Sequence, residues 1–63
     1  MISVDKEGGT IKIRANVGGR EYEAVGLRVD SPAVVGLLVI QMLRDGVPLD
    51  EICRVLKEAL QHL

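Results

Sequence analysis

The chain has 63 residues, of which 48% are hydrophobic and 27% charged, with 8 basic and 9 acidic side chains and a formal net charge of -1. This length supports a single small domain over residues 1–63 and excludes a second core. The near-neutral charge gives no long-range attraction to phosphate backbones or anionic lipids, which argues against a general nucleic-acid or membrane-surface binder.

Two Gly-Gly pairs separate three N-terminal stretches in which apolar and polar side chains alternate. Glycine readily adopts the positive φ angles that two-residue hairpin turns require. Gly8-Gly9 and Gly18-Gly19 therefore predict a three-stranded antiparallel meander with strands at about 2–7, 10–17 and 20–29.

The strand register follows from the turn lengths. A two-residue first turn places Val4 opposite Ile13 on the inner face. The second turn places Arg14 opposite Glu23 on the outer face. Apolar side chains then meet apolar ones on the inner face, which supports the meander.

The alternation changes phase in the third strand. Beyond Ala24 the apolar positions are Val25, Leu27 and Val29. We expect a β-bulge at Ala24-Val25, next to Gly26, because one extra residue returns Leu27 to the inner face.

Two helices are expected after the strands. Ser31 followed by Pro32 predicts a helix start with the serine hydroxyl as N-cap, and Gly46 predicts its end, so the first helix covers about 32–45. The second runs from about 49 to the end. The predicted fold class is α+β, a three-stranded antiparallel β-meander followed by an α-helical hairpin.

The first helix is unusual because Gln41 is its only polar side chain from Ala33 to Leu43. A helical wheel divides it into two arcs. The arc expected against the sheet comprises Val35, Gly36, Val39, Ile40, Met42 and Leu43. The opposite arc comprises Ala33, Val34, Leu37, Leu38 and Gln41.

A small sheet and one neighbouring helix can cover only the first of these arcs. We therefore expect the second arc to be a self-association surface at an oligomer interface, with Gln41 hydrogen-bonded to its symmetry mate in a homodimer. Three alternatives remain open. The sheet curls around this helix in a monomer, a different protein occupies the arc, or first strands pair at their edges, a mode that an inward-pointing Lys6 disfavours.

The outer face of the sheet is a second candidate site. A row on this face comprises Thr10, Lys12, Arg14 and Asn16 on the second strand, and Arg28 lies on the third. A β-sheet reader presents such a row to a DNA groove. Asp5 and Glu23 lie opposite Lys12 and Arg14, however, and neutralise much of the row. Because of this neutralisation, a dimeric DNA-binding regulator is only the alternative function.

The remaining side chains indicate no catalysis. Cys53 and His62 project to opposite sides of the second helix, so they cannot share a metal ion. We expect no enzyme activity, no cofactor and no metal. A lone cysteine and the lack of an apolar segment of about 20 residues favour a cytoplasmic location without a membrane partner. The leading expectation is a small, non-enzymatic homodimeric protein-interaction or regulatory module.

Overall fold

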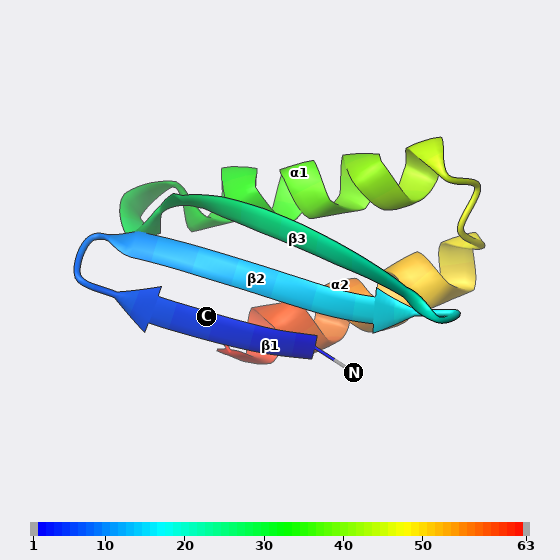
Figure 1. Ribbon diagram of the computed structural model, residues 1–63, viewed down its shortest axis with the longest axis horizontal. Helices are drawn as coiled ribbons and strands as arrows, with labels where there is room; N and C mark the ends of the chain where they lie inside the picture. The colour runs from blue at the N-terminus through cyan, green and yellow to red at the C-terminus, as the bar shows by residue number, and fades with distance from the viewer. Residues whose placement is uncertain (1, 63) are drawn as a thin grey trace.

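The computed structural model describes residues 2–62 as a three-stranded sheet and two helices (Figure 1). The elements are β1 (Ile2–Glu7), β2 (Thr10–Val17), β3 (Arg20–Leu27), the 3-10 turn η1 (Arg28–Asp30), α1 (Ser31–Arg44) and α2 (Leu49–His62). The sheet is antiparallel in the order β1-β2-β3. The α+β class and the order of elements are confirmed.

Both hairpins turn at the predicted Gly-Gly pairs, where Gly8, Gly18 and Gly19 have positive φ angles. The predicted register is also confirmed: Val4 lies opposite Ile13, and the outer-face pairs follow the same alignment. The two-residue turns and the buried inner face together fix the strand register, because a shift of one residue would move the apolar side chains of a strand to its outer face.

The β-bulge expected between Ala24 and Val25 is wrong. β2 and β3 pair without an inserted residue, and Gly26 occupies an inner-face position. A Cβ atom on Gly26 would lie 2.6 Å from Cγ2 of Val34. The missing side chain therefore lets α1 approach β3 closely, and Val25 and Leu27 stay exposed on the outer face.

The N-cap role expected for Ser31 is also wrong, because η1 leads directly into α1 and places Ser31 inside the helix. The Ser31 hydroxyl donates to the Arg28 carbonyl at 2.6 Å. The N-cap position falls to Asp30, whose side chain makes no capping hydrogen bond. Arg28, expected on the third strand, belongs to η1.

As predicted, α1 ends before Gly46, whose φ is 76°. The Val47 N–H donates to the Met42 carbonyl at 3.0 Å, and Gly46 N–H donates to the Leu43 carbonyl at 3.1 Å. These two bonds form a Schellman motif, which satisfies carbonyl groups that the helix end leaves unpaired. The tight turn allows α2 to begin almost at once.

Both helices pack on one face of the sheet, α1 against β3 and β2, and α2 mainly against β1 (Figure 1). The buried core comprises Ile11, Ile13, Ala15, Val17, Tyr22, Ala24, Val34, Val35, Leu38, Met42, Ile52, Val55 and Ala59. It is aliphatic apart from Tyr22 and Met42. Neither helix within residues 2–62 has the length and apolarity needed to cross a membrane.

Candidate interaction surface

α1 exposes a line of apolar side chains on its side away from the sheet. Leu37 and Ile40 are each 50% exposed, and Leu43 is 52% exposed. Ala33, also exposed, lies four residues before Leu37, so these side chains are neighbours along the helix surface. We call Ala33, Leu37, Ile40 and Leu43 the α1 stripe. Ala33 and Leu37 are exposed as the sequence predicted.

The expected division of α1 into two arcs is otherwise wrong. Val34 and Leu38 are only 2% and 1% exposed, because the chain's own core covers them. Ile40 and Leu43, which were expected against the sheet, are exposed instead. The helix is turned by about one residue, roughly 100°, from the expected orientation. The space above Gly26 explains this rotation of the helix, because the Val34 side chain fills that space.

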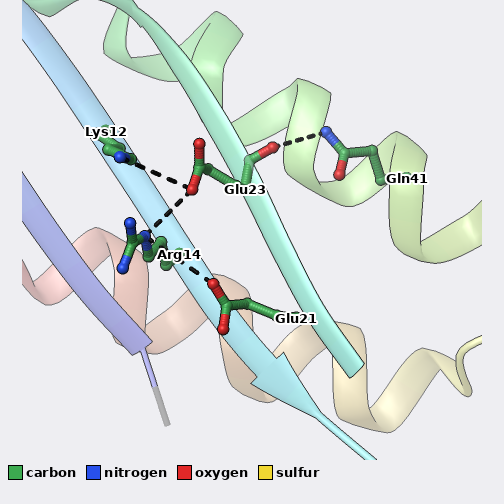
Figure 2. Close-up of polar contacts among 5 residues, drawn as sticks. All are labelled: Lys12, Arg14, Glu21, Glu23 and Gln41. Carbon is green, nitrogen blue, oxygen red and sulfur yellow. Dashed lines mark hydrogen bonds and ion pairs between the residues drawn. The ribbon is translucent and has the colours of Figure 1, made fainter. Parts of the chain in front are cut away.

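Gln41 helps to hold α1 in this orientation. Its Nε2 donates to the backbone carbonyl of Glu23 at 2.9 Å (Figure 2). β3 is an edge strand, so this carbonyl points to a side where no further strand pairs with it. The Gln41 amide therefore has a partner within its own chain, where the sequence led us to expect one in a symmetry mate.

The basic row on the outer face of the sheet is tied to two glutamates (Figure 2). Arg14 Nε donates to Glu23 Oε2 at 3.1 Å and lies 4.0 Å from Glu21 Oε1. Lys12 Nζ lies 3.8 Å from the same Glu23 oxygen, although Asp5 is its cross-strand neighbour. Two bases and two acids thus form one network, which leaves little net charge on this face.

The other two members of the expected DNA-binding row do not strengthen it. Asn16 is exposed on β2 opposite Glu21, one of the two glutamates of this network. Arg28 is exposed in η1, beyond the end of β3. The structure therefore does not align the four residues along two neighbouring strands.

A shallow hollow of about 460 Å³ lies between the β2–β3 turn and the α1–α2 connection. Asp45 Oδ2 accepts hydrogen bonds from Arg20 Nη1 at 2.9 Å and from the Tyr22 hydroxyl at 3.0 Å. Burial, followed by the bond to Asp45, raises the pKa of Tyr22. Arg54 pairs with Glu51 on the opposite wall. The charged side chains of the hollow are thus already paired and anchor the connection to the sheet.

Cys53 and His62 are both exposed on α2. Within residues 2–62, no three histidine, cysteine or acidic side chains gather closely enough to hold a metal ion. Neither residue contributes to the α1 stripe.

Comparison with family models, with curated proteins and with solved structures found no match for this chain.

Proposed function

We propose that the chain is a small, non-enzymatic protein-interaction or regulatory module that works as a homodimer and self-associates through the α1 stripe. The supporting observation is the half-exposure of three large aliphatic side chains, Leu37, Ile40 and Leu43, on one helix face. Fully burying such a side chain is worth about 1.5–3 kcal/mol, so covering the exposed halves of all three gains roughly 2–4 kcal/mol per protomer.

The size of the stripe sets the strength of the proposed dimer. A helix of 14 residues is about 21 Å long and about 10 Å wide, so two such faces bury less than the roughly 1,200 Å² of a standard interface. Small interfaces of this kind belong to weak complexes. We therefore expect a concentration-dependent dimer with a dissociation constant in the micromolar range or weaker, about 10⁻⁵ to 10⁻⁴ M.

The ion pairs of Lys12 and Arg14 with glutamates weaken the alternative, a DNA-binding regulator, because a phosphate backbone would have to displace them. We propose no nucleic-acid partner. The proposed location is the cytoplasm, since Cys53 is exposed and is the only cysteine of the chain. Disulfide-forming compartments favour paired cysteines.

Light scattering on a sizing column, repeated over a range of concentrations, tests the dimer. We expect the mass of the wild-type protein to rise toward twice the chain mass, and Leu37→Glu to remain a monomer with an unchanged far-UV circular dichroism spectrum. Leu60→Glu is the matched control, because Leu60 is 57% exposed but lies on α2. A wild-type protein that stays monomeric throughout, or equal effects of the two variants, would contradict the proposal.

A further inference from the structure

We infer that two copies pair α1 against α1 in antiparallel order across a two-fold axis at Leu37, with Asp30 of each copy beside Arg44 of the other. This inference rests on the proposed function. It adds the orientation of the two chains and the residues that select it.

The first support is the spacing of residues along α1 and its N-cap residue, Asp30. Asp30, Ala33, Leu37, Ile40 and Arg44 follow one another at steps of three, four, three and four residues. Such steps keep side chains on one line of a helix and create the seam of a helix pair. At about 1.5 Å per residue, Leu37 lies about 10.5 Å from each end of this line. A two-fold axis through Leu37 therefore brings the Asp30 end of one copy beside the Arg44 end of the other.

The second support is the match of side-chain sizes. Ala33 lies four residues before Leu37, and Ile40 lies three residues after it. Rotation about the axis therefore brings Ala33 of one copy to within about 1.5 Å of the level of Ile40 of the other. A small side chain then faces a large one on each side of the Leu37 pair. Alternating sizes of this kind let two helices approach closely.

The third support is charge. Arg44 is the only charged side chain in α1, and Asp30 directly precedes the helix. Both are exposed, and neither forms an ion pair with another of residues 2–62. Antiparallel pairing places an acid beside a base at both ends, whereas parallel pairing would place like charges together. The charges thus favour antiparallel order, as does the opposition of the two helix dipoles.

These three features identify the partner as a second copy. A two-fold interface needs one surface that is complementary to itself after rotation. The line from Asp30 to Arg44 meets that condition in size and in charge. A different protein would have to reproduce the same order of an acid, small and large apolar groups, and a base.

Charge reversal tests the orientation. Arg44→Asp and Asp30→Arg should each weaken the dimer roughly 10- to 30-fold at low ionic strength, because two attractive contacts become repulsive. The double variant should restore the dissociation constant to within about threefold of the wild type. Lys57→Glu is the control for net charge, since Lys57 is exposed on α2. Sedimentation equilibrium measures the constants, and circular dichroism verifies each fold.

Three results would overturn the inference. If Arg44→Asp weakens the dimer no more than Lys57→Glu does, the two chains pair in another orientation. In that case the proposed function still stands, provided that the wild type is a dimer and Leu37→Glu dissociates it. A double variant as weak as the single ones would show that the two charges do not meet. A wild-type monomer would remove both proposals. If Asp30→Arg does not fold, Arg44→Asp and the milder Arg44→Gln still decide, and both should weaken the dimer.

Discussion

The contact between Gly26 and Val34 fixes how closely α1 approaches the sheet, so Gly26→Ala should destabilise the fold. The new Cβ atom would lie 2.6 Å from Val34 Cγ2. Ordinary carbon contacts are about 3.5–4.0 Å. Val34 cannot easily swing aside, because a valine in a helix has essentially one allowed χ1 rotamer. The helix itself must therefore move away from β3.

The expected magnitude follows from two opposing effects. Overpacking a core by one methyl group costs about 1–3 kcal/mol. Replacing a strand glycine by alanine recovers roughly 0.5–1 kcal/mol of backbone entropy. We expect a net loss of about 1–2 kcal/mol in the free energy of unfolding of Gly26→Ala. That is a large part of the roughly 3–5 kcal/mol that so small a core supplies.

A double-mutant cycle isolates the contact. Val34→Ala alone should cost about 2–3 kcal/mol, because Val34 is buried and its truncation leaves a cavity. In the double variant the methyl group on residue 26 enters that cavity, so the combined loss should be smaller than the sum by about 1 kcal/mol or more. Urea denaturation followed by circular dichroism at one protein concentration gives the three values. A Gly26→Ala variant as stable as the wild type, with additive losses, would refute this account of the packing.

Burial raises the pKa of Tyr22. The neutral Tyr22 side chain should therefore contribute its full stability below about pH 10, and this contribution should be lost as the pH rises through the raised pKa. In urea titrations at alkaline pH, Tyr22→Phe should accordingly lose less stability with rising pH than the wild type does. Met42→Ala should lose about 2–5 kcal/mol in urea denaturation, since Met42 is fully buried, whereas Cys53→Ala at an exposed site should change stability by less than about 0.5 kcal/mol. We expect the protein not to bind labelled duplex DNA in fluorescence anisotropy at low ionic strength. Binding by the wild type that is lost in Arg14→Glu would restore the DNA-binding alternative.

The strands could be predicted from the sequence because local rules determine them. The Gly-Gly pairs define both turns, and each two-residue turn sets the register of the neighbouring strands. Gly46 ends α1 for an equally local reason, since its positive φ closes the helix. No distant contact was needed for these features.

The orientation of α1 could not be predicted in the same way, because a helix that is apolar on nearly every side has no polar face to mark the solvent. One signal was present in the sequence: Arg44 lies on the same line as Leu37 and Ile40, which are exposed. The role of Gly26 is a tertiary effect, since its space matters only once Val34 lies above it. The bond between Tyr22 and Asp45 likewise joins residues far apart in the chain.

The most direct test of self-association through the α1 stripe is disulfide cross-linking at its centre. Helix axes 8–10 Å apart, with Cα atoms about 2.3 Å from each axis, leave about 3.5–5.5 Å between the Cα atoms of facing residues, within or just below the range that a disulfide spans. The variant carries Leu37→Cys and Cys53→Ser, so that its only thiol lies on the proposed axis. The control carries Leu60→Cys in the same background.

Under mild oxidation at a concentration near the dissociation constant, we expect the Leu37→Cys protein to form a covalent dimer much faster than the Leu60→Cys protein. Circular dichroism should show that both are folded. Equal rates of cross-linking in the two proteins would contradict self-association through the α1 stripe.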